Sequence, residues 1–302
     1  MKRLVAVLVA AGLIAAAVFI RRALDDDEAG GDDGSGADGT PTLICATEAA
    51  EACDRLEQSG LVELVTTEPA GATADRLAAG EALGADGWLT ADFWPGMVEV
   101  VRDPNLGTVD LDASDVLASS AVIVARAPSI GENVQSDECG GAVTWACFAE
   151  RAGSPPFRIG IDPTDESAGL ATAAMAAAGI VGDVPPRPEE MEDEAVRLWR
   201  TLPQEVEQTR GEPVLTTLAT FQGQFDLATG FEVIRRDRTP LLAVPPEPTV
   251  GLVIAGDPGR FDTEAVARAL GESGWERGGA TQGLPGPGVM VALRDEWEAN
   301  AR

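Results

Sequence analysis

The 302-residue chain contains no histidine and no tyrosine, and Lys2 is its only lysine. Without histidine, neither a Ser-His-Asp nor a Cys-His nucleophile can form, and imidazole-ligated zinc or copper is excluded. Ser–Lys catalysis is excluded as well, because Lys2 precedes a long apolar segment that separates it from the rest of the chain. Carboxylate catalysis stays open, but the sequence singles out no pair of acids. We therefore expect a protein that is not an enzyme and that has no cofactor or metal.

Several recognition motifs are also missing. The sequence contains no Walker loop, no G-x-S-x-G elbow and no EF-hand loop. Basic residues are scarce, since 22 Lys and Arg stand against 50 Asp and Glu, which gives a formal charge of −28. This excess of negative charge disfavours nucleic acid and anionic membrane surfaces as partners.

The first 40 residues carry the clearest positive signal. Leu4–Ile20 is an unbroken run of 17 apolar or small residues with basic residues on both sides, and an acidic, glycine-rich run follows it. A helix of that length rises about 26 Å, close to the roughly 30 Å hydrocarbon core of a bilayer. We expect residues 1–24 to be a single-pass membrane anchor and 25–40 a linker, with the bulk of the chain extracytoplasmic at the cell membrane. The alternative is a signal peptide cleaved at Ala15–Ala17.

The four cysteines fall into two sequence-adjacent pairs, each with a spacing of eight. In an exported protein such pairs favour disulfides, whereas a four-cysteine zinc site would need C-x-x-C pairs. Of the three possible pairings we predict Cys45–Cys53 and Cys139–Cys147. Loops this short give about 2–3 kcal/mol each in the chain-entropy model.

After the linker, strand and helix signals alternate. The expected strands are 42–47, 61–67 and 87–90, and the expected helices are 48–58, 73–81 and 95–102. This β-α-β-α-β-α order predicts an α/β protein with a parallel sheet and helices on both faces.

Two extended passages divide the remaining chain. The run 116–127 is the longest apolar segment after the N-terminal one, and we expect it to cross from one lobe to a second. A strand at 157–161 and a helix ending at Gly179 follow, and segments 215–220 and 230–234 fit either two strands or a strand and a helix. The passage 241–255 is expected to cross back, and helices at 263–270 and 289–298 close the chain.

This organisation predicts two lobes with a cleft between them. Lobe I comprises 41–120 and 245–302, and lobe II comprises 121–244. Ligands of open parallel sheets bind beyond the carboxyl ends of the strands, so the loops there should face the cleft.

The order of elements, together with three segments, resembles bacterial extracellular solute-binding proteins. The segments are Asp162–Gly169 at a strand-to-helix turn, Gly274–Trp275 followed by Gly283–Val289, and Leu293–Trp297. More narrowly, the chain resembles the type 2 periplasmic-binding fold of actinobacterial envelope proteins, and the turn is similar to that of the molybdate-binding branch. The resemblance implies a two-lobed α/β fold with two hinge crossings and a small-molecule solute as ligand. It also implies an ABC-type permease or an envelope protein as partner.

The sequence departs from these relatives in three respects. Iron-binding members use tyrosine ligands, which this chain lacks. A fused von Willebrand factor A domain would carry a D-x-S-x-S metal motif, which Asp112–Val116 breaks. No cysteine for lipid attachment follows the apolar run, unlike in transporter-linked relatives. Besides solute binding, a ligand-free scaffold or sensor of the cell envelope therefore stays an alternative.

Four turns supply the expected ligand-binding residues. They are Thr47 and Glu48; Ala91, Asp92 and Trp94; Thr164, Asp165 and Ser167; and Gln222, Gln224 and Asp226. Helix N-termini at such turns suit anions, but the acids favour a cationic or neutral polar ligand, with Trp94 offering a ring face. In the alternative interpretation, these acids only complement helix dipoles and the hydroxyls only cap helices.

Overall fold

The computed structural model describes residues 39–127, 144–145, 147, 158–181, 207–208, 213–220, 224–234, 241–242 and 247–301. Thr40–Arg302 forms one compact unit. Residues 1–38, with the expected anchor and most of the linker, lie outside the described residues. Within the described part, no helix is long and apolar enough to span a bilayer.

The first three strands form a parallel sheet, as predicted from the alternating pattern. They are β1 (Thr42–Ala46), β2 (Glu63–Glu68) and β3 (Gly87–Ala91), and β1 lies between the other two. Every residue of β3 is buried, and only Thr90 among its five residues is polar, as expected of a strand that is covered on both faces.

Helices follow each of these strands. They are α2 (Ala50–Gln58), α3 (Ala70–Ala78) and α4 (Phe93–Val101). α3 starts three residues before the predicted position 73, because Pro69 serves as its N-cap and the helix begins directly after it. Short 3-10 helices are found at Thr47–Ala49, Pro104–Leu106, Glu232–Ile234 and Pro258–Arg260.

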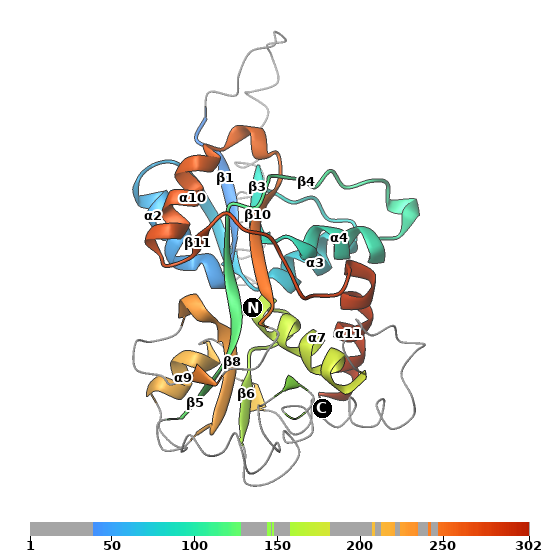
Figure 1. Cartoon of the computed structure of the whole chain (residues 1–302). Helices are drawn as coiled ribbons and strands as arrows, with labels where there is room; N and C mark the ends of the chain where they lie inside the picture. Colours follow the sequence, from blue (N-terminus) through green and yellow to red (C-terminus); the bar gives the residue numbers. More distant parts are fainter. Residues whose placement is uncertain are drawn as a thin grey trace, which may run out of the picture. The chain divides into compact units, whose positions relative to one another are not determined.

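The long strand β5 (Ala118–Arg126) takes part in two sheets (Figure 1). Its residues 118–121 pair antiparallel with β10 (Thr249–Gly256), and its residues 122–126 pair antiparallel with β8 (Leu227–Phe231). β10 also runs antiparallel to β3, so the sheet is mixed and not parallel throughout. The sequence prediction of a parallel sheet is wrong here, because β10 returns to the sheet in the opposite direction.

The second sheet continues from β5 through β8 to β6 (Ile159–Ile161) and β7 (Glu207–Gln208). β6 runs parallel to both β8 and β7. The small strands β4 (Asp112–Ala113), β9 (Leu241–Leu242) and β11 (Glu276–Arg277) pair with β10, β5 and β5 respectively.

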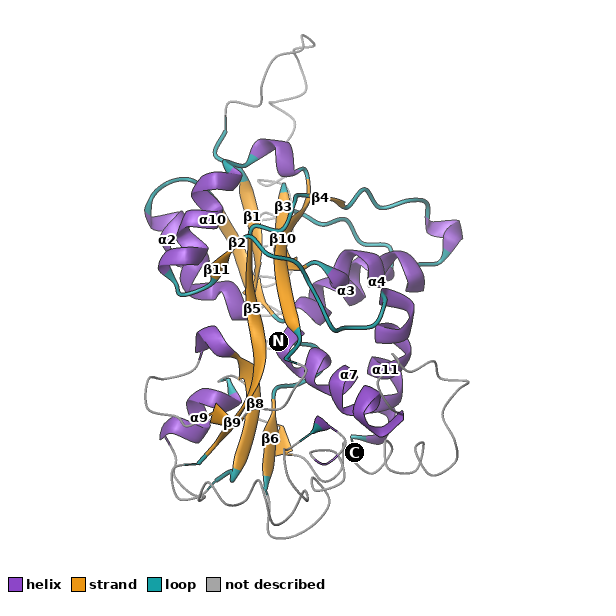
Figure 2. Ribbon diagram, in the orientation of Figure 1, coloured by secondary structure: helices purple, strands orange, loops and turns teal. Residues whose placement is uncertain are grey.

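Helices cover both faces of the first sheet. α2 packs against α10 (Thr263–Glu272) on one face, and α3 packs against α4 on the other (Figure 2). In the second half, α7 (Ser167–Val181) and α9 (Val214–Thr220) flank β8, so the undecided segment 215–220 is helical. The last helix, α11 (Pro287–Asn300), contacts both α4 and α7 and so connects the two halves. The division into lobes I and II stays a prediction.

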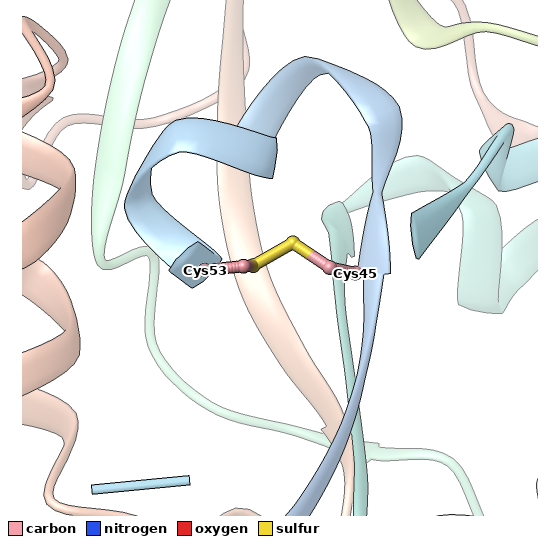
Figure 3. Close-up of a disulfide and its surroundings, with 2 residues drawn as sticks. All are labelled: Cys45 and Cys53. Atoms are coloured by element: carbon pink, nitrogen blue, oxygen red, sulfur yellow. A yellow bond between two sulfur atoms is a disulfide. The ribbon is translucent and has the colours of Figure 1, made fainter. Parts of the chain in front are cut away.

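A disulfide joins Cys45 at the end of β1 to Cys53 in α2, with 6.5 Å between the Cα atoms (Figure 3). The first predicted pairing is thus confirmed. Cys147 is also disulfide-bonded, but Cys139 lies outside the described residues, so the second predicted pairing stays a prediction.

Candidate functional site

The turn between β6 and α7, residues 162–167, contacts the loops that follow β1, β2 and β3. The backbone N–H of Gly71, at the start of α3, donates a hydrogen bond to the carbonyl of Asp165 over 2.8 Å. A Cβ atom at position 71 would lie 2.8 Å from Cα of Asp165, closer than van der Waals contact allows. The absence of a side chain at Gly71 therefore permits this approach.

A buried serine links two of the loops to the turn. The indole Nε1–H of Trp94 donates to Oγ of Ser167 over 2.9 Å, and the Ser167 hydroxyl in turn donates to the carboxylate of Glu48. Trp94 and Ser167 are fully buried. The structure thus brings together three residues that the sequence analysis named from three separate turns.

Four carboxyl groups meet at this contact. Glu48 lies on the β1 side, and Asp162, Asp165 and Glu166 lie in the turn; we call these four residues the acid cluster. Among the described residues, no salt bridge reaches any of them. Oε2 of Glu48 and Oδ1 of Asp165 are inaccessible to solvent and have no described hydrogen-bond partner. Unpaired buried carboxylates are costly, so the cluster favours protonation or a cationic partner.

Burial raises the pKa values of three members of the acid cluster, Glu48, Asp162 and Glu166. Desolvation raises the pKa of Glu48, even though the Ser167 hydrogen bond acts in the opposite direction. Desolvation also raises the pKa of Asp162 to about 7, although the N–H of Val214 donates to its Oδ1 over 2.8 Å. For Glu166, burial and then the neighbouring carboxylates of Asp162, Glu48 and Asp165 raise the pKa to about 8. Near neutral pH the cluster therefore binds protons that exposed acids would have released.

Arg294 of α11 lies over the Trp94 ring, with its guanidinium carbon 5.4 Å from the ring centroid. It forms two hydrogen bonds to Asp75, of 2.7 and 2.8 Å, and an ion pair of 2.9 Å with Glu298. Asp75 and Glu298 neutralise the charge of Arg294, so the guanidinium contacts the Trp94 ring with its own charge already matched. A cavity of about 320 Å³ lies beside this stack, between α3, α4 and α11.

Asp92 has a different set of contacts. Its N–H donates to the carbonyl of Gly251 over 3.0 Å, and its carboxylate accepts a 2.6 Å hydrogen bond from Thr281. The Thr281 hydroxyl accepts from the N–H of Gly251 over 2.8 Å. Burial raises the pKa of Asp92 despite the Thr281 bond. Asp92 thus ties the end of β3 to β10.

The other residues that were predicted to bind ligand differ in their exposure and in their place in the fold. Thr47 is exposed, Ala91 is the buried last residue of β3, and Thr164 is buried within the turn. Gln222 lies outside the described residues.

The segment that contains Gln224 and Asp226 is not a strand-to-helix turn, as the sequence analysis assumed. It leads from α9 into β8 and lies at the amino-terminal edge of β8, where Asp226 accepts a 2.8 Å hydrogen bond from the N–H of Arg158. β6 runs parallel to β8, so this edge is opposite to the one where the turn 162–167 begins. Gln224 is exposed there. The structure therefore does not bring Gln224 or Asp226 to the acid cluster.

Comparison with known proteins rests on structure alone, because no protein-family model and no curated protein matches the sequence. A periplasmic thiamin binding protein is 12% identical, with a TM-score of 0.56, and the match covers 90% of this chain and 100% of that one. The fructose-6-phosphate-bound periplasmic binding protein AfuA from Actinobacillus pleuropneumoniae is 14% identical, with a TM-score of 0.52 and coverage of 88% and 97%. A ferric binding protein from Campylobacter jejuni is 10% identical, with a TM-score of 0.52 and coverage of 86% and 98%.

The chain has the type 2 periplasmic-binding fold. In this fold the acid cluster of the present chain stands at the carboxyl ends of β1 and β6, the position at which open α/β sheets bind ligands. The described residues contain no group of three His, Cys, Asp or Glu side chains arranged to hold a metal ion.

The sequence analysis missed three residues at this site: Gly71, Asp162 and Arg294. Asp162 belongs to the Asp162–Gly169 segment that carried the resemblance, so its acidity was a usable signal. Gly71 follows Pro69 at a strand-to-helix turn, which was a weaker signal. Nothing in the local pattern indicated Arg294, because its contact with Trp94 depends on how α11 packs.

Proposed function

We propose that the chain is an extracytoplasmic solute-binding domain that binds a small cationic or neutral polar solute at the acid cluster. The observation that carries this proposal is the pair of buried carboxylate oxygens without a partner, Oε2 of Glu48 and Oδ1 of Asp165, on opposite sides of one contact. An ammonium or amidinium group placed between them would satisfy both. Trp94, beside them, offers an aromatic edge for the body of the solute.

Binding requires the contact to open. In the proposed motion, lobe I (41–120 and 245–302) and lobe II (121–244) separate about the two crossing strands. β5 supports this role, because its pairing changes from β10 to β8 between Ala121 and Val122. The second crossing of the proposed hinge is the return passage 241–255, which leads from β9 into β10. Opening would break the Gly71–Asp165 and Trp94–Ser167 hydrogen bonds and hydrate the four acids.

The charge of the site favours cations over oxyanions. A sulfate, molybdate or phosphate group would meet the acid cluster, and the nearby Arg294 is already paired with Asp75 and Glu298. The fold neighbours include a protein named for thiamin, which is a cation, and one that holds a sugar phosphate. The acid cluster of this chain suits the first chemistry better than the second.

We further propose that residues 1–24 anchor the domain in the cell membrane and that 25–40 give it reach, so that the domain serves an ABC-type permease or another envelope protein. The apolar run with basic flanks supports the anchor. An alternative is a ligand-free scaffold or sensor. The direct contact between Gly71 and Asp165 favours that alternative, since the chain itself occupies the place of a solute.

A thermal-shift screen at pH 8 tests solute binding. Thiamin, choline, putrescine and arginine represent cations, glucose represents neutral polar solutes, and sulfate, molybdate and fructose 6-phosphate represent anions. We expect at least one cationic or neutral solute to raise the melting temperature by several degrees at millimolar concentration. Glu48→Gln should reduce that shift, whereas Glu51→Gln, on the exposed face of α2, should not. Stabilisation by the anions alone would contradict the proposed chemistry, and no shift with any solute would favour the scaffold.

A further inference from the structure

We propose that the contact between the turn 162–167 and the loops after β1, β2 and β3 is a proton-controlled latch, which closes the empty domain at acidic pH and opens it as the pH rises. The inference concerns the regulation of the proposed solute site and takes its role from the proposed function. We call the contact the latch; its members are Glu48, Gly71 and Trp94 on one side and Asp165, Glu166 and Ser167 on the other.

The attractive part of the latch does not depend on charge. The Gly71–Asp165 hydrogen bond joins two backbone groups, and the Trp94–Ser167 bond joins an indole to a hydroxyl. Both exist at any pH between about 4 and 9, because none of these four groups titrates there. The latch can therefore hold the closed form whenever the neighbouring acids do not repel one another.

The repulsive part depends on protonation. Glu48 faces Glu166 and Asp165 across the contact, and the charges of Asp162, Glu48 and Asp165 all disfavour ionisation of Glu166. The other charged groups that face this region are Asp75 of α3, Arg294 and Glu298 of α11, and Asp92 after β3. Arg294 is paired with Asp75 and Glu298, and Asp92 is bonded to Thr281. None of these groups supplies an unmatched positive charge to the latch.

The direction of the effect follows from proton linkage. In an open form, Glu48 and Glu166 are hydrated and have pKa values of about 4–5. In the closed form, burial raises both pKa values, that of Glu166 to about 8. The closed form therefore binds more protons, so its population relative to the open form falls as the pH rises from about 4 to about 8. Asp162 contributes less to this change, because its bond to Val214 lies within one half of the molecule.

This linkage makes protons and a cationic solute competitors for the same carboxyls. At acidic pH, protons satisfy the acids and the latch excludes solute. Near neutral pH, where the closed form still holds protons, a cation replaces them, so binding should release protons. The empty domain thus has a closed form of its own that differs from the solute-bound one.

Hydrogen exchange of the Gly71 amide in the full-length chain without solute tests the latch. This N–H donates its hydrogen bond to Asp165 across the contact. Its protection, corrected for the intrinsic exchange rate at each pH, therefore reports how much of the protein has the latch closed. We expect the protection factor to fall about tenfold or more between pH 5 and pH 8. Glu48→Gln/Glu166→Gln, which keeps the side-chain shape without the charge, should stay protected and change less than about threefold over that range.

The matched control is Glu51→Gln/Glu57→Gln, which removes the same charge from exposed positions of α2 and should retain the wild-type pH dependence. Constant protection in the wild type, or an unchanged pH dependence in the Glu48/Glu166 variant, would overturn the proposal. If circular dichroism shows that the double variant is unfolded, Glu166→Gln alone must weaken the pH dependence. Because no solute is present, this result is independent of the thermal-shift screen, and either proposal can fail without the other.

Discussion

The indole N–H of Trp94 donates a 2.9 Å hydrogen bond to Oγ of Ser167, a residue 73 positions further along the chain. Ser167 passes the interaction on to Glu48 through its own hydroxyl proton. One buried hydroxyl thus connects the start of α4, the start of α7 and the loop after β1. Three turns that are distant in sequence meet in a single chain of hydrogen bonds.

Ser167→Ala should destabilise the protein by about 1–3 kcal/mol, because it leaves the buried Trp94 N–H and one Glu48 oxygen without their partner. Urea denaturation at pH 6 measures the change. Ser59→Ala is the control, since the Ser59 hydroxyl only bonds to Leu56 at the exposed end of α2 and its loss should cost less than about 0.5 kcal/mol. Equal effects of the two substitutions would show that the Ser167 bridge contributes nothing.

Gly71→Ala should push the turn 162–167 away, since the new methyl group would lie 2.8 Å from Cα of Asp165. We expect a loss of about 1–3 kcal/mol and faster exchange of the amides in the turn. Gly288→Ala in α11 offers a matched control, because nothing lies within 4 Å of the position that its methyl group would take. That variant should be neutral or slightly stabilising. Wild-type stability in Gly71→Ala would contradict the close contact.

Asp86 should show the opposite pH dependence to the latch. Burial acts to raise its pKa, but hydrogen bonds from Thr42 and the Arg260 guanidinium outweigh burial and hold the pKa below its usual value. A lowered folded-state pKa stabilises the protein above about pH 4, and this stabilisation is lost as the pH falls through the folded-state value. Asp86→Asn should therefore cost about 1 kcal/mol at pH 7 and much less at pH 2.5. Chemical denaturation at pH 7 and at pH 2.5, with Asp54→Asn on α2 as the control, measures the change in the free energy of unfolding. An equal cost of Asp86→Asn at the two pH values would refute the assignment.

Removal of the first disulfide should lower stability by about 2–3 kcal/mol. Cys45 and Cys53 are both fully buried, so Cys45→Ala/Cys53→Ala tests the cross-link with little change in polarity. The midpoint of urea unfolding provides the measurement. Fully reduced wild type should unfold at a urea midpoint close to that of the double variant. If the reduced protein keeps the midpoint of the oxidised protein, the cross-link does not stabilise the fold.

The sequence predicted those parts of the fold that depend on local pattern. β1, α2, β3 and α10 lie within a few residues of their expected positions, because apolar periodicity and turn residues specify them locally. The direction of β10 was not predictable, since strand pairing depends on contacts between distant segments. Segment 215–220 stayed undecided because so short a run does not allow a period of 2 to be told from one of 3.6.

The candidate site was predictable in part for the same reason. Glu48, Trp94, Asp165 and Ser167 were named because each follows a predicted strand, and strand ends meet at one edge of a sheet. Asp226 was named on the same rule but lies at the other edge of the sheet. The segment before it is the helix α9 and the segment after it is the strand β8, so Asp226 precedes a strand and does not follow one. The raised pKa of Glu166 depends on burial and on three neighbouring acids, none of which can be read from local sequence.

Calorimetric titration of the full-length chain at pH 7, in two buffers of different ionisation enthalpy, tests the central claim most directly. The titrants are the cations of the screen, with molybdate and sulfate alongside them. We expect a cationic solute to bind with release of protons into the buffer, because it replaces the protons held by Glu48 and Glu166. Tight binding of molybdate or sulfate, with no binding of any cation, would contradict the account.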